Sequence, residues 1–166
     1  MLNQKNGINT ETWVGNIISK NIENVNVKLL FSIITVFLGS LLLIASAKIK
    51  VPLYPVPMTL QPMAVLMIAM LFGRKLATLT VGLYIFKGII GLPVFAFGGG
   101  LMYLMGPTGG FILGFFVSAF IVGYLADSGW GKKVSLSIIS MLIGMLVIYS
   151  LGIFQLALLK GFNFAL

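Results

Sequence analysis

GLPVFAFGGGLMYLMGPTGG, residues 91–110, is the stretch that decides the fold. It carries no charged side chain, yet its glycines and prolines prevent any single helix or strand from running through it. Large apolar side chains lie between these breakers, and a water-exposed loop would not accumulate them. Irregular backbone of this kind is tolerated among membrane helices where it is buried or lines a cavity. We therefore expect residues 91–110 to form the wall or lid of an enclosed site in a membrane protein.

The composition of the whole chain favours a membrane protein. Of its 166 residues, 59% are hydrophobic and 8% are charged, and the mean hydropathy is +1.10. A soluble domain of this size needs far more charge on its surface. The length allows roughly five or six helices of about 20 residues that cross the membrane. The sequence predicts an all-α fold, a polytopic membrane helical bundle of about five helices with irregular loops that cap a cavity.

Apolar runs divide the chain into a tail and a transmembrane domain. Residues 1–28 are polar, and a weak apolar stripe from Trp13 onward indicates either a short interfacial helix or a partly ordered tail. Residues 29–166 form the predicted transmembrane domain. Within it we expect helices over residues 29–47, 62–72, 76–90, 111–126 and 134–159. The second of these is only about 16 Å long, against about 30 Å of hydrocarbon, so the segment before it must supply the remaining depth.

That preceding segment, VPLYPVPMTLQP (residues 51–62), is a second uncharged stretch without helix. Its four prolines favour an extended backbone, and Tyr54, Thr59 and Gln61 are its polar groups. The larger share of Lys and Arg falls on the side of the N-terminus, which predicts a cytoplasmic N-terminus in the plasma membrane. Both uncharged segments then lie on the outer side. We expect them to converge there over a pocket for a molecule that arrives from outside.

Two further features carry competing interpretations. Lys87 lies near the end of the third expected helix, where it either extends to the interface or faces the cavity and meets an anionic ligand group. Gly106, Gly110, Gly114 and Ser118 recur at every fourth position. A helix face that carries only small residues indicates close packing against another helix.

Composition and motifs exclude several functions. The net charge of +8 comes from basic residues that flank apolar runs, which indicates membrane orientation rather than nucleic-acid binding. The chain has no cysteine and no histidine, so thiolate and imidazole metal sites are excluded. No acid–base pair is close enough for catalysis, and the triplet Gly98–Gly100 continues into neither phosphate-binding motif. We predict a protein that is not an enzyme, without catalytic residues, metal or cofactor, which draws energy from a partner.

Three blocks of the sequence resemble the BioY family, the biotin-specific S component of energy-coupling-factor (ECF) transporters. They are KVPLYPVPMTLQ (residues 50–61), YIFKGIIGLPVFA (84–96) and GGGLMYLMGPTGGFILG (98–114). The resemblance implies a six-helix protein of the cell membrane that captures biotin from outside. It also implies docking on a transmembrane coupling subunit and a pair of cytoplasmic ATPases, which alone use ATP. Partners are thus biotin, these subunits and the lipid bilayer, but no nucleic acid.

The resemblance also implies a ligand site under the two uncharged segments. Aromatic walls would enclose the ring system, while polar side chains and loop amides would hydrogen-bond it, although plain core packing explains each aromatic residue equally well. The predicted ligand-binding residues are Thr59, Gln61, Tyr84, Lys87, Phe95, Phe97, Gly98, Gly99, Gly100 and Tyr103.

The resemblance has one departure. Family members carry an Asp and a Lys on a sixth helix, for the ureido ring and carboxylate of biotin, and this chain reaches Leu166 without that block. A truncated fragment that binds nothing, or an S component for another water-soluble vitamin, are the alternatives.

Overall fold

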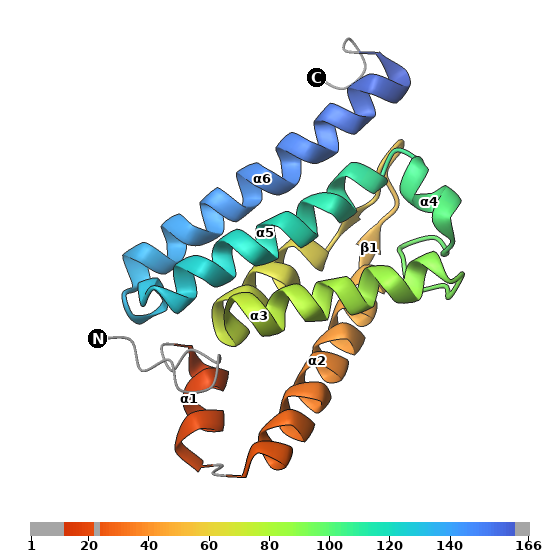
Figure 1. Ribbon diagram of the computed structural model, residues 1–166. Helices are drawn as coiled ribbons and strands as arrows, with labels where there is room; N and C mark the ends of the chain where they lie inside the picture. The colour runs from red at the N-terminus through yellow and green to blue at the C-terminus, as the bar shows by residue number, and fades with distance from the viewer. Residues whose placement is uncertain (1–11, 22–23, 162–166) are drawn as a thin grey trace.

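The computed structural model describes residues 12–21 and 24–161, which are almost entirely helical (Figure 1). The elements in chain order are α1 (Trp13–Asn21), α2 (Val25–Lys48), β1 (Lys50–Val51), β2 (Met58–Thr59), α3 (Gln61–Ile89), α4 (Leu101–Met105), α5 (Gly109–Asp127), the 3₁₀ turn η1 (Trp130–Lys132) and α6 (Val134–Lys160). Four of them, α2, α3, α5 and α6, are long and apolar enough to cross a membrane by length and composition, α3 only when its two arms on either side of Gly73 are counted together. The predicted polytopic helical bundle is confirmed.

Helix α3 is a hairpin of two arms. Its residue Gly73 has φ 75° and ψ 177°, which is not helical backbone. Gln61 Nε2 donates a hydrogen bond of 2.7 Å to Tyr84 Oη, although a straight helix would hold these residues about 35 Å apart. The chain therefore reverses at Gly73, between arms over residues 61–72 and 74–89 (Figure 1). This confirms the two helices that the sequence predicts on either side of Gly73.

The turn of this hairpin rests against the end of α5. Asp127 Oδ2 accepts a hydrogen bond of 3.2 Å from the backbone N–H of Arg74, the first residue of the second arm. A Cβ on Gly73 would collide with the Asp127 carboxylate and would lie 2.9 Å from Thr12 Cγ2. Glycine meets both demands here, a positive φ and a close neighbour.

Helix α5 lies between the α3 hairpin and α6, and the core forms along it (Figure 1). Its glycines permit close approach to α6: a Cβ on Gly114 would lie 2.8 Å from Ile148 Cα, and one on Gly110 would collide with the carbonyl of Leu151. Close packing by this small-residue face is confirmed for both glycines. Helix α2 packs on α3 through a strip of mostly small residues, and its other faces point outward, as membrane helices require.

The structure corrects one helix boundary and adds two short elements. Helix α2 begins at Val25 rather than residue 29, because the Asn24 side chain caps it by accepting from the N–H of Asn26 at 3.0 Å. Residues 50–59 contain an antiparallel pair of short strands with Lys50 opposite Thr59. The stretch 91–110 includes the five-residue helix α4, where we expected irregular backbone throughout.

The tail contains the helix that the apolar stripe indicates. Val14 and Ile18 of α1 are buried against Leu76 of α3, whereas Trp13 is 67% exposed. Its position at the membrane surface stays a prediction. Residues 1–11 and 22–23 of the expected tail lie outside the described residues.

Candidate ligand-binding site

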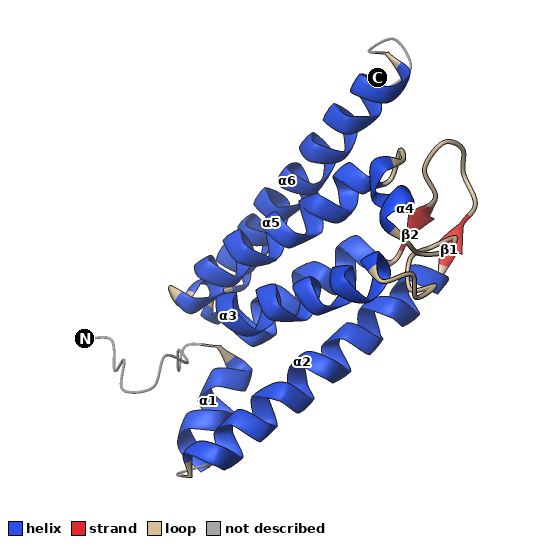
Figure 2. Ribbon diagram, turned by 45° about the vertical axis from the view of Figure 1, so that its right-hand side comes forward, coloured by secondary structure: helices blue, strands red, loops and turns tan. Residues whose placement is uncertain are grey.

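A cavity of about 200 Å³ lies at the end of the bundle where the two uncharged segments meet. Figure 2 shows the β1–β2 hairpin and α4 at this same end. The lining residues are Leu53, Val56, Pro57, Met58, Thr59, Gln61, Pro62, Phe95, Ala96, Tyr103, Thr108, Phe111, Ile112, Phe115 and Tyr149. None of these side chains is charged. The cavity is thus an apolar, aromatic space with a few hydroxyl and amide groups.

A buried polar pair marks the wall formed by α3. Gln61 is 4% exposed and Tyr84 is 1% exposed, and the amide of Gln61 donates to the Tyr84 hydroxyl. Burying an amide is costly unless it is hydrogen-bonded, so Tyr84 stabilises Gln61 at this position. The Gln61 amide has a further N–H and a carbonyl oxygen, which a ligand in the cavity can bond.

Three aromatic rings continue this wall. The Tyr84 ring meets Phe95 edge-on, with centroids 5.5 Å apart and an angle of 75°. Phe95 in turn stacks on Tyr103 at 5.0 Å and 24°. The rings come from α3, the following loop and α4, so their contacts fix the loop against the bundle.

Lys48 at the end of α2 and Lys50 in β1 hold the same loop. Lys48 Nζ donates to the carbonyls of Pro93 and Phe95, at 2.7 and 2.8 Å. Lys50 Nζ donates to the carbonyl of Ala96 and lies 3.6 Å from the centroid of the Phe97 ring. The loop that follows α3 is therefore joined to the end of α2 and to β1 by charge-assisted hydrogen bonds.

A model of the BioY family matches residues 19–166 of the chain. The chain belongs to the BioY family. This family member is 45% identical over 118 residues to the biotin transporter BioY of Thermotoga maritima, covering 69% of this chain and 68% of the relative. It is 42% identical over 118 residues to the probable biotin transporter BioY of Pyrococcus horikoshii, covering 70% and 68%.

A solved structure shares the fold of this BioY family member. It is the crystal structure of the S-component for biotin from an ECF-type ABC transporter, with a TM-score of 0.70 and 24% sequence identity. The match covers 85% of this chain and 78% of the solved one. The helical bundle seen here therefore has the same fold as that solved structure.

Four of the predicted site residues line the cavity: Thr59, Gln61, Phe95 and Tyr103. A fifth, Tyr84, lies behind them as the hydrogen-bond partner of Gln61. The polar and aromatic residues that the sequence singles out are thus brought together from segments far apart in the chain. Their contact with a ligand stays a prediction.

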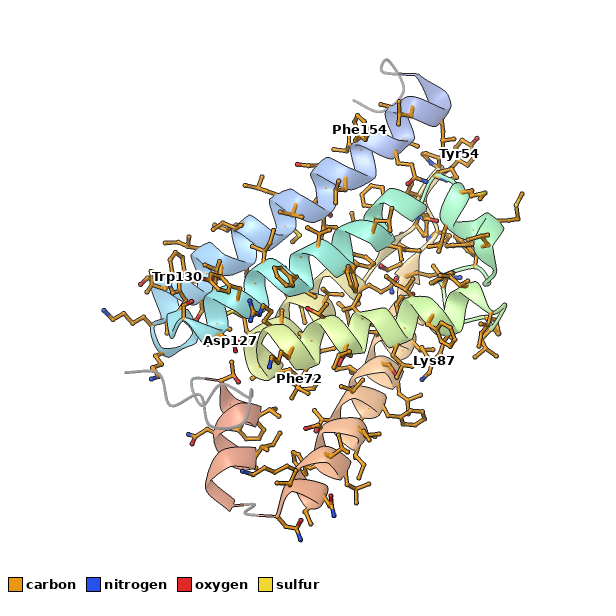
Figure 3. All side chains as sticks on the ribbon, in the orientation of Figure 1. Tyr54, Phe72, Lys87, Asp127, Trp130 and Phe154 are labelled. Carbon is orange, nitrogen blue, oxygen red and sulfur yellow. The ribbon has the colours of Figure 1, made fainter. Side chains whose placement is uncertain are left out.

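The structure places Lys87 away from the cavity. Its Nζ donates to Ser40 Oγ of α2 at 2.9 Å and lies 4.4 Å from the centroid of the Phe37 ring. Figure 3 shows Lys87 on the side of α3 that faces α2. The expectation of a cation facing the cavity is wrong, because this position of α3 points toward α2 rather than toward α5.

Phe97 and the glycine triplet also lie outside the lining. Phe97 is 59% exposed and packs under Lys50. Gly98 accepts from the N–H of Phe95 through its carbonyl at 2.9 Å, and Gly100 donates its N–H to the carbonyl of Gly88 at 2.7 Å. A Cβ on Gly99 would collide with the carbonyl of Leu92. These glycines shape the loop, and the amide of Gly100 is already bonded within it.

Helices α5 and α6 contribute residues that the sequence analysis missed. Phe111 and Tyr149 line the cavity with ring centroids 6.0 Å apart and nearly perpendicular planes. Gln155 Nε2 of α6 donates to the carbonyls of Leu104 and Gly106, at 3.0 and 2.7 Å. A lone glutamine in a long apolar helix is the signal that could have pointed to this contact.

Proposed function

We propose that this BioY family member is the substrate-binding subunit of an ECF-type transporter and captures biotin from outside the cell. The observation that carries the proposal is the uncharged aromatic cavity with the Gln61–Tyr84 pair in its wall. Biotin has a compact apolar bicycle with a polar ureido edge, which matches aromatic walls and one amide partner. The volume of about 200 Å³ falls below the roughly 300 Å³ of the smallest drug-sized sites, which suits a small vitamin.

The distribution of charge supports the proposed orientation. Arg74 and Lys75 follow the α3 turn, and Lys132 and Lys133 lie in and after η1, which contacts α5 at the end where Asp127 bonds Arg74. Figure 3 shows Asp127 and Trp130 at the end opposite Tyr54 and the cavity loops. A basic end favours the cytoplasm, so the cavity opens outward. Release inward is driven by a coupling subunit and two ATPases that dock from that side.

A binding titration tests this function. The full chain is purified in detergent and titrated with labelled biotin, and unlabelled water-soluble vitamins are then added as competitors. We expect saturable binding that unlabelled biotin alone displaces. Displacement by a different vitamin instead would make the chain an S component for that vitamin, and absence of binding to a folded sample would contradict the proposal.

A further inference from the structure

Two ammonium groups are each bonded to the backbone of the cavity wall. Lys48 donates to the carbonyl of Phe95 and Lys50 to that of Ala96, and both Phe95 and Ala96 line the cavity. The Phe97 ring under Lys50 holds that ammonium in place by a cation–π contact. Each ammonium group is thus hydrogen-bonded to a residue that lines the cavity.

No acidic residue compensates these charges within residues 12–21 and 24–161. The one acidic residue in that part of the chain, Asp127, lies at the opposite end and bonds Arg74. The partners of Lys48 and Lys50 are neutral carbonyls, and an ammonium has three N–H groups, of which these contacts occupy two for Lys48 and one for Lys50. Lys50 is half-buried and Lys48 is exposed, and cations without a counter-charge favour an anionic ligand group, the half-buried one most.

The cavity itself offers no cation, since its lining is uncharged. None of the lining residues can therefore pair with a ligand carboxylate, whereas Lys48 and Lys50 are bonded to the carbonyls of two of them. We infer that Lys48 and Lys50 form a carboxylate subsite beside the cavity, with Lys50 as the direct partner. This rests on the proposed function: the biotin ring lies against Gln61, and its valerate chain runs out to the two lysines.

The consequence is selectivity for a free carboxylate. Charge-assisted hydrogen bonds are worth more than neutral ones, so an esterified tail should bind on the order of 10- to 100-fold more weakly. Because the ester keeps the ring system but lacks the charge, its affinity measures the contribution of the cavity without the carboxylate contact. Comparing biotin with biotin methyl ester therefore isolates the subsite.

The experiment measures the affinities of biotin and its methyl ester for the full chain in nanodiscs of neutral lipid. In the wild type biotin binds more tightly than the ester. Lys50→Met, which keeps the length of the side chain, should lower the affinity for biotin to that for the ester and leave the ester unchanged. Lys50→Arg should keep the preference, and Lys48→Met should reduce it. Lys87→Met, at a lysine bonded to Ser40, is the matched control and should keep it fully.

Two results would overturn the subsite while leaving biotin capture intact. Equal affinity of the wild type for biotin and ester would show that the carboxylate has no cationic partner, and this readout needs no variant. A parallel loss of both ligands in Lys50→Met would show that the lysine only holds the loop. Failure of the folded wild type to bind either compound would instead contradict the proposed function, and the subsite with it.

Discussion

Gln61 is the residue whose side chain links the cavity to the core. It lines the ligand space, and it donates to a hydroxyl that is almost completely buried. Its orientation is thereby fixed before any ligand arrives, which lowers the entropic cost of binding. Thr59 supports the same turn, since its Oγ1 accepts from the N–H of Gln61 at 3.4 Å.

Replacing Gln61 by alanine should weaken biotin binding by about tenfold or more, because it removes an amide that lines the cavity and is proposed to bond the ligand. Tyr84→Phe is the matched variant: it removes only the hydroxyl behind Gln61. We expect it to lower the free energy of unfolding by about 1–3 kcal/mol through the unsatisfied amide, with a smaller effect on affinity. Titration with labelled biotin and thermal unfolding check both. Wild-type affinity in Gln61→Ala would exclude this residue from the site.

At the residue scale, the sequence identifies which residues belong near the site better than it predicts where their side chains point. Thr59 and Gln61 could be found because they are the polar side chains next to prolines in an uncharged segment. Lys87 was misplaced because the sequence does not tell which neighbour each side of α3 faces, and that neighbour is Ser40. Lys48 and Lys50 were missed for the same reason: their partners are carbonyls more than 40 residues away.

At the scale of elements, the hairpin of α3 and the contact of α5 with α6 define the bundle. Both depend on glycine. The hairpin needs a residue with positive φ, and the contact of α5 with α6 needs two backbones to approach closely. Such glycines can be recognised in the sequence as helix breakers or as a repeat of small residues. Helix positions were accordingly predictable to within a few residues.

Short elements could not be predicted in this way. Helix α4 spans five residues, and its last turn is closed by the N–H of Gly106 bonding to Tyr103. A helix this short is not stable by itself, so it forms because the surrounding rings and Gln155 hold the loop. The sequence of residues 101–105 alone contains no such information.

Gly73→Ala should destabilise the protein strongly. Alanine at φ 75° costs about 1–3 kcal/mol, and its Cβ would also collide with the Asp127 carboxylate. Gly131→Ala is the control, since its Cβ would meet only Met70 Cε, at 3.7 Å. The measurement is the fraction that stays monodisperse in detergent after heating. Equal heat resistance of the two variants would contradict the tight turn.

Gly114→Val should separate α5 from α6. Its side chain would press on the backbone of Ile148, 2.8 Å from the Cβ position, and overpacking of this kind costs about 1–3 kcal/mol. Gly82→Ala, whose Cβ would make an ordinary contact of 3.5 Å with Phe116, should leave stability unchanged. Thermal unfolding midpoints compare the two. Because α6 supplies Tyr149 to the cavity, Gly114→Val should also weaken biotin binding.

At the scale of the whole molecule, the bundle has one end with the cavity and another with a basic turn. The proposed orientation puts the cavity outside and the turn between α5 and α6 inside. The chain has no native cysteine, so single introduced cysteines report topology without background. Tyr54→Cys should react with an impermeant maleimide in intact cells, and Ser135→Cys only after permeabilisation. The reverse pattern would contradict the orientation.

The first arm of α3 is short, and this sets how far a captured molecule still has to travel. From Gln61 to the turn at Gly73 it spans only about 18 Å, compared with about 30 Å of hydrocarbon. With the cavity facing outward and the turn at the inner edge of the hydrocarbon, a vitamin resting on Gln61 would lie about 12 Å deep, which is most of the outer leaflet's half of about 15 Å. In the proposed transporter, release inward would then require the helices to part over about 18 Å, rather than across the entire hydrocarbon core.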